Sequence, residues 1–246
     1  MIRRVLYPTL LSAIFILFVF CGNTLFLSPL AKRPEKKVPE YTYLSPYVGI
    51  SHYDNQFREA ADSTGYEWTL IAAIAFTESR FDSTAISGAG ACGVMQMMPR
   101  TLRGLGIADS LHMDNRTNIM AAAKLLKSLD MRYSYIGSKD ERISFVLASY
   151  NAGYGHIQDA MRLARKYGKD RHIWEASVDS FLVFKSMPEY YTDTLCRNGI
   201  FKDWKQTLSF VKKVRKHWTR FSRAQEEYKD SIENVVANDT LKKIGR

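Results

Sequence analysis

The chain has 246 residues, of which 46% are hydrophobic, so it has enough apolar material for a folded core and is not disordered overall. Its net charge of +10 at pH 7 favours anionic partners such as nucleic acid, membrane headgroups or acidic polymers. Its three cysteines, Cys21, Cys92 and Cys196, show neither CxxC nor Cys/His spacing of the zinc type, so we predict no metal site.

The first predicted element is an apolar run over residues 6–28, preceded by Arg3 and Arg4. This run is long enough to cross a hydrocarbon layer of about 30 Å as a helix. Positive charge before it predicts a cytoplasmic tip of residues 1–5 and an exported remainder. We therefore expect a membrane-spanning signal anchor at the N-terminus.

Two alternatives for this segment remain open. A cleaved signal peptide would have a shorter apolar region and a small-residue cleavage site, which does not follow clearly here. A lipoprotein would be anchored through Cys21, but Phe20 stands before it where a small residue is expected. In an exported protein Cys92 and Cys196 could form a disulfide, although two small buried thiols fit the sequence equally well.

Residues 29–50 are charged and contain several prolines, which predicts an extended linker. Residues 51–221 have helical periodicity without period-two alternation, so we predict a mainly α domain. A charged tail or frayed helix over residues 222–246 has little to bury. Asn115 or Thr117 is a candidate N-terminal cap for the helix predicted over Ile119–Met131. The predicted helices cover Trp68–Phe76, Ile119–Met131, Arg142–Tyr150, Ile157–Tyr167, Val178–Lys185 and Trp204–Phe221.

Glu78 is the first candidate catalytic residue. It follows an apolar stretch, and an apolar environment raises the pKa of a carboxyl group, so that it can donate a proton near neutral pH. The alternative is a solvent-facing glutamate paired with Arg80. Asp82, four residues on, is more plausibly a cap or an ion-pair partner than a second catalytic acid.

A glycine-rich segment follows, with Gly93 and its neighbours permitting tight turns. In it, Gln96 offers donors and acceptors that suit an N-acetyl sugar. Met95 offers adaptable apolar surface, although methionines at such spacing are usually core residues. Farther on, Tyr150 can form a hydrogen bond while its ring packs, and Asn151 can hold a loop or a sugar.

Together these segments resemble the signature blocks of the family 1 lytic transglycosylases, the SLT domain. The family has Glu-Ser, then Gly-Leu-Met-Gln and Met-Pro, then Ala-Tyr-Asn-Ala-Gly. Here the blocks are Glu78-Ser79, Gly93-Val94-Met95-Gln96 with Met98-Pro99, and Ser149-Tyr150-Asn151-Ala152-Gly153, in the same order. The resemblance runs from about Tyr53 to Val214.

The segment from Pro188 to Gly199, with Tyr190 and Tyr191, is similar to the end of the catalytic domain in the membrane-bound transglycosylase F type. Those proteins often carry a solute-binding domain before the catalytic one. We expect no such module within these 246 residues.

The resemblance implies a lysozyme-like α fold with a substrate groove, and cleavage of the bond between N-acetylmuramic acid and N-acetylglucosamine in peptidoglycan. It implies Glu78 as the single acid/base, with formation of a 1,6-anhydro ring. Ser79, Met95, Gln96, Tyr150 and Asn151 would bind or position the sugar, and Tyr190 and Tyr191 would line the groove or pack against the core.

No metal or cofactor is required by this chemistry. The expected location is the periplasmic face of the bacterial cell envelope, anchored in a membrane, with peptidoglycan strands as partner, no nucleic acid, and envelope protein partners unknown. Three other functions fit the same residues: a goose-type lysozyme-like hydrolase, a non-catalytic peptidoglycan-binding protein, and a muramidase that opens the cell wall locally for a secretion system.

Overall fold

The computed structural model describes residues 49–244, with side chains described as far as residue 231. The predicted anchor over residues 6–28 and nearly all of the linker lie outside the described residues. Among the helices of residues 49–244, none has the length and apolar character needed to cross a membrane.

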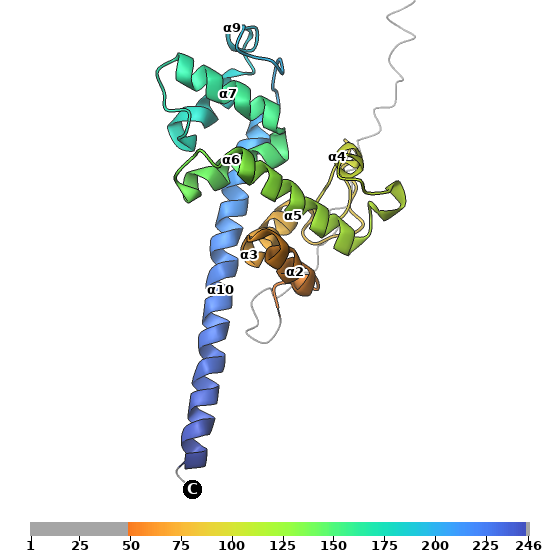
Figure 1. Cartoon of the computed structure of the whole chain (residues 1–246), viewed down its shortest axis with the longest axis vertical. Helices are drawn as coiled ribbons and strands as arrows, with labels where there is room; N and C mark the ends of the chain where they lie inside the picture. The colour runs from red at the N-terminus through yellow and green to blue at the C-terminus, as the bar shows by residue number, and fades with distance from the viewer. Residues whose placement is uncertain (1–48, 245–246) are drawn as a thin grey trace, which may run out of the picture. The chain divides into compact units, whose positions relative to one another are not determined.

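The described chain is built from helices, which confirms the mainly α prediction (Figure 1). Within residues 49–244 the strand-like contacts are isolated bridges that join Cys92 to Ile86 and to Met97. A 3-10 turn, η1, covers Asp109–Leu111, and an irregular turn, η2, covers Trp174–Val178. The α-helices are α2 (Asp54–Thr64), α3 (Trp68–Ser79), α4 (Pro99–Gly104), α5 (Asn115–Arg132), α6 (Lys139–Ala152), α7 (Tyr154–Lys166), α8 (Asp179–Phe184), α9 (Pro188–Tyr191) and α10 (Trp204–Ile244).

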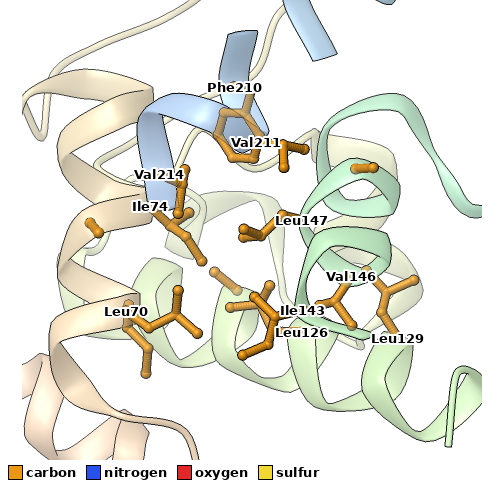
Figure 2. Close-up of a cluster of buried hydrophobic side chains, with 14 of the residues drawn as sticks. Leu70, Ile74, Leu126, Leu129, Ile143, Val146, Leu147, Phe210, Val211 and Val214 are labelled. Atoms are coloured by element: carbon orange, nitrogen blue, oxygen red, sulfur yellow. The ribbon is translucent and has the colours of Figure 1, made fainter. Parts of the chain in front are cut away.

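The core lies where α3, α5, α6 and α10 meet. Figure 2 shows Leu70 and Ile74 of α3 facing side chains from the other three helices, among them Leu126, Leu147 and Val214. These five side chains are at most 2% exposed. Fully burying one such side chain contributes roughly 1.5–3 kcal/mol. Helix α3 is apolar all round because neighbouring helices cover every side of it.

Helices α3 and α10 begin at the predicted residues, whereas the starts of α5, α6 and α7 differ from the prediction by a few residues. Helix α5 begins after Asp114, whose carboxylate accepts a hydrogen bond of 2.8 Å from the Thr117 amide. The predicted caps, Asn115 and Thr117, are therefore both wrong, because both already lie inside the helix. The acidic side chain one position earlier was the better acceptor for the unpaired amides of the first turn.

Helix α10 continues to Ile244, through the segment for which the sequence predicted a charged tail or a frayed helix. Its first half is the part that packs against α3, with Val214 and Phe221 fully buried and Ser222 Oγ 3.0 Å from Thr69 Oγ1. Farther along, the helix runs away from the other helices (Figure 1). The apolar pattern that predicted a helix over Trp204–Phe221 thus marks the packed portion.

Cys92 and Cys196 are both free thiols in the structure. The Cys92 thiol is buried and lies 3.4 Å from the Met97 carbonyl oxygen, and the Cys196 thiol lies 3.2 Å from the carbonyl oxygen of Tyr190. Of the two states left open by the sequence, the structure has the unpaired one.

Candidate active site

Glu78 lies in the last turn of α3, at the edge of the core. The helix ends immediately after it because Arg80 and Phe81 adopt left-handed backbone conformations, with φ of 54° and 65°. The Glu78 side chain is half-buried, and burial raises the pKa of its carboxyl group to about 8. A group with that pKa is mostly protonated at neutral pH.

The alternative of an ion pair with Arg80 is not what the structure contains. The Arg80 guanidinium lies over the Phe76 ring, 5.2 Å from its centre. Within the described residues Glu78 takes part in no ion pair. Asp82 is exposed, and its carboxylate accepts hydrogen bonds from the Thr84 amide and hydroxyl at 2.9 and 2.7 Å. Asp82 thus stabilises the turn that follows α3 and caps no helix among the described residues.

Ser79 connects the end of α3 to the glycine-rich segment. Its hydroxyl donates a hydrogen bond of 2.7 Å to the carbonyl oxygen of Val94, and lies 3.3 Å from the Ala75 carbonyl oxygen. Ser79 thus fixes the position of the loop that follows Gly93 relative to Glu78.

A buried asparagine of α5 holds the same loop from another side. The Asn118 side-chain oxygen accepts a hydrogen bond of 2.9 Å from the Met95 amide, and its nitrogen donates to the carbonyl oxygens of Cys92 and His112 at 3.1 and 3.0 Å. Gly93 allows this close approach, because a Cβ atom there would lie 2.7 Å from the Asn118 nitrogen. Sequence reasoning missed Asn118, although an amide on an otherwise apolar helix face was a usable signal.

Tyr150 of α6 approaches the loop from a third side. Its hydroxyl donates a hydrogen bond of 2.8 Å to the Met95 carbonyl oxygen, and its ring is parallel to that of Phe210, with 6.2 Å between ring centres. Burial and the nearby Glu78 carboxyl group raise the pKa of Tyr150 well above its usual value. The hydroxyl therefore stays protonated, and Tyr150 and Glu78 are neighbours in one site.

The two departures from the family pattern are accommodated without disturbing this arrangement. Ser149, where the family has alanine, is buried, and its hydroxyl lies 2.7 Å from that of Tyr133, so the two buried hydroxyls satisfy each other. Val94 is fully buried, and its backbone carbonyl is the acceptor for Ser79.

Gln96 is a non-glycine residue with a left-handed conformation, φ 48°. Its side-chain nitrogen donates hydrogen bonds of 3.0 and 2.9 Å to the carbonyl oxygens of Ala85 and Gly93. These bonds fix the orientation of the amide, and its oxygen is left as an acceptor. The side chain is half-buried, so that oxygen is available to a ligand.

The methionines divide between core and surface. Met95 and Met97 are 0% and 2% exposed, whereas Met98 is 41% exposed. The Met95 side chain therefore belongs to the core, and Met95 contributes to the site through its backbone amide and carbonyl.

Asn151 lines a pocket of roughly 510 Å³. Its side-chain oxygen accepts a hydrogen bond of 2.8 Å from the hydroxyl of Thr207, which is fully buried at the start of α10. His156, Gln206 and Ala89 also line this pocket. None of these neighbours of Asn151 was singled out from the sequence, because they come from separate segments of the chain.

Tyr190 lies in an aromatic cluster formed by α8, α9 and the C-terminal end of α7. Its ring centre is 5.0 Å from that of Phe184 and 5.5 Å from that of Tyr167. This is the packing role that the sequence left open beside a role in the groove. Tyr191 is half-buried on the same short helix.

No group of His, Cys, Asp and Glu among the described residues could hold a metal ion.

The residues of this arrangement, a carboxyl group at the end of a buried helix and a loop held by three helices, all lie within residues 55–173. Residues 55–173 match the family model of the transglycosylase SLT domain, so the chain carries an SLT domain, as its motifs predicted. The chain is 36% identical over 148 residues to membrane-bound lytic murein transglycosylase F of Desulfosudis oleivorans, covering 60% of this chain and 32% of that protein.

It is also 33% identical over 177 residues to membrane-bound lytic murein transglycosylase F 1 of Alkalilimnicola ehrlichii, covering 72% of this chain and 35% of that protein. The chain thus spans about a third of the length of these curated relatives. Two solved structures align with 71% and 69% of the chain and 24% of their own, at 22% identity and TM-scores of 0.48 and 0.49. They are an inactive mutant of lytic transglycosylase Slt from Pseudomonas aeruginosa and the 70 kDa soluble lytic transglycosylase of Escherichia coli.

Proposed function

We propose that this chain is a peptidoglycan lytic transglycosylase with Glu78 as its single acid/base. The observation that carries the proposal is the half-buried carboxyl group of Glu78, whose pKa is raised to about 8 within an SLT domain. Such a group can first donate a proton and then accept one at neutral pH.

In the proposed reaction, protonated Glu78 donates its proton to the oxygen of the bond between N-acetylmuramic acid and N-acetylglucosamine, and that bond breaks. The acetamido oxygen of the muramyl residue stabilises the positive anomeric carbon. The Glu78 carboxylate then takes the proton of the C6 hydroxyl of the same residue, whose oxygen closes a 1,6-anhydro ring. The proton returns to Glu78 and no water is consumed.

A single carboxyl group suits this site. Glycosidases with two carboxyl groups place both beside the bond that is cut. The nearest sequence candidate, Asp82, is exposed and already accepts two hydrogen bonds from Thr84. We therefore assign Asp82 no part in the chemistry.

Four further side chains would place the sugar. The Gln96 amide oxygen and the Asn151 amide can bind polar groups of the substrate. Ser79 and Tyr150 hold the loop of Met95 beside Glu78 through its backbone carbonyls.

We further propose that residues 6–28 anchor the protein in a membrane, with the SLT domain on the periplasmic face of the cell envelope and a lysozyme-like groove facing the glycan strands.

The test is mass spectrometry of the products released from purified peptidoglycan sacculi by the full chain in detergent. Muropeptides with anhydro ends, lighter by one water than hydrolytic products, are expected, and they should disappear with Glu78→Gln. Reducing-end products would instead make the protein a hydrolase of the same fold. No products, with the protein still sedimenting with sacculi, would leave a peptidoglycan-binding module.

A further inference from the structure

The pocket beside Asn151 contains a histidine whose role the proposed reaction does not explain. His156 lies in the first turn of α7 and lines the pocket. Its ring packs against Phe201, with 4.6 Å between ring centres and 34° between ring planes. Its Nδ1 atom lies 3.0 Å from the Nζ atom of Lys185, a residue that is fully buried and does not line the pocket.

This contact determines which ring nitrogen carries the proton. A lysine ammonium group has three donors and no acceptor. Nδ1 must therefore present its lone pair to Lys185, and a neutral imidazole then has its hydrogen on Nε2. Burial and the Lys185 charge both lower the pKa of His156, outweighing the opposite effect of Asp159 and Asp203, which favours the neutral ring.

Lys185 cannot turn away from His156, because a buried carboxylate holds it. The Lys185 Nζ atom lies 2.5 Å from Asp159 Oδ2, and both side chains are 0% exposed. The Asp159 carboxylate is itself held by Arg162, by the Arg197 amide at 3.0 Å and by the Asn198 amide at 2.9 Å. A buried pair with this many partners has one arrangement, so the orientation of the histidine ring is fixed as well.

The Nε2–H group has no hydrogen-bond partner among residues 49–231, and the ring lines the pocket. Around it, Asn151 and Gln206 offer amides, and Phe201 and Ala152 offer apolar surface. Fixed polar groups beside an aromatic face suit a sugar unit, which has hydroxyl and amide oxygens at its edge and C–H groups on its faces.

We propose that His156 is a saccharide-binding residue whose Nε2–H donates a hydrogen bond to an oxygen of an N-acetylated sugar in this pocket, and that Lys185 and Asp159 are the positioning residues that fix this donor. The inference rests on the proposed function, since it assigns the pocket to the same glycan strand. It adds a binding group outside the signature blocks and gives the buried Lys185–Asp159 pair a purpose beyond packing.

The test is nitrogen NMR of the histidine rings in the full chain carrying Glu78→Gln, which prevents turnover, titrated with tetra-N-acetylchitotetraose. The His156 signal should report the Nε2–H form between pH 7 and 8 and should move on addition of the tetrasaccharide. A ring with its proton on Nδ1, or a charged ring in this range, would overturn the proposal.

Two variants measure the contribution of the donor to binding. His156→Phe keeps a flat ring without a donor and should weaken tetrasaccharide binding by about tenfold, whereas His156→Gln keeps an N–H donor and should stay within about threefold of the parent. If His156→Phe does not fold, the NMR titration of the chain carrying Glu78→Gln alone still tests whether His156 binds the sugar.

Unchanged affinity in a folded His156→Phe variant, or binding that leaves the His156 signal unmoved, would refute the role of His156 without touching the reaction. Failure of the tetrasaccharide to bind at all would refute it too. The proposed function is decided separately, by the products released from sacculi.

Discussion

The hydroxyl of Tyr150 and the backbone carbonyl of Met95, 55 positions apart in the sequence, are joined by a hydrogen bond of 2.8 Å. The bond ties α6 to the loop beside Glu78. We expect Tyr150→Phe to leave a buried carbonyl unpaired and to lower the free energy of unfolding by about 1–3 kcal/mol. Urea denaturation measures this. The matched control is Tyr135→Phe, whose hydroxyl is 3.8 Å from a methionine sulfur and whose side chain is half exposed. Equal stability of the two variants would contradict the assignment.

The raised pKa of Glu78 predicts a dependence of stability on pH. The folded protein holds the proton up to a pH of about 8, whereas the unfolded chain releases it near the ordinary value of 4.5. Between these values the folded state binds more protons, so stability falls as pH rises through this window. Glu78→Gln removes the effect. The free energy of unfolding of the variant, measured relative to the parent chain, should therefore rise from pH 5 to pH 8, by a few kcal/mol at most. A constant difference would mean that the carboxyl group is not perturbed.

The same pKa predicts the pH dependence of cleavage. The first step requires protonated Glu78, so kcat/KM for release of soluble fragments from sacculi should fall as pH rises through about 8. Because kcat/KM reports the free enzyme, the midpoint of this fall can be compared directly with the pKa of the free site. A fall centred near pH 4.5, the ordinary value for a glutamate, would remove the argument for an acid role.

We expect that no residue with a side chain can replace Gly93 without loss of stability. It has φ of 76°, and an added Cβ would lie 2.7 Å from the Asn118 nitrogen. Gly93→Ala should therefore combine backbone strain with the loss of the hydrogen bond that the Met95 amide donates to the Asn118 side-chain oxygen. Gly90→Ala is the matched control, since Gly90 has φ of 86° and nothing within 4 Å of the added atom. Thermal unfolding should show a larger loss for Gly93→Ala, by about 1–3 kcal/mol, and cleavage should be impaired in that variant alone.

The long helices could be predicted from the sequence because their apolar residues repeat with the helical period. Ile157–Tyr167, for example, covers most of α7. Helix ends were less accessible, as Asp114 illustrates, because several polar residues near a helix start can accept the same amide hydrogen bonds. Glu78 could be identified because its apolar surroundings are its sequence neighbours.

The rest of the site depends on contacts between distant segments. Asn118, His156 and Thr207 are separated from the residues they contact by 23, 29 and 56 positions in the chain, so their partners cannot be read from local spacing. Met95 presents the reverse case. Its side chain suggested a sugar contact, but a fully buried side chain leaves only its backbone to act.

The loop of residues 93–97 accepts hydrogen bonds from the hydroxyls of Ser79 and Tyr150 and donates one to Asn118. These three residues belong to three different helices. Loop amides ordinarily exchange their hydrogens with solvent through small local openings. Here the Met95 amide can open only if the loop leaves all three helices together, which requires the core itself to come apart. This irregular segment should therefore exchange its Met95 amide hydrogen as slowly as the middle of α3, and a protease should cut it no faster than the domain unfolds.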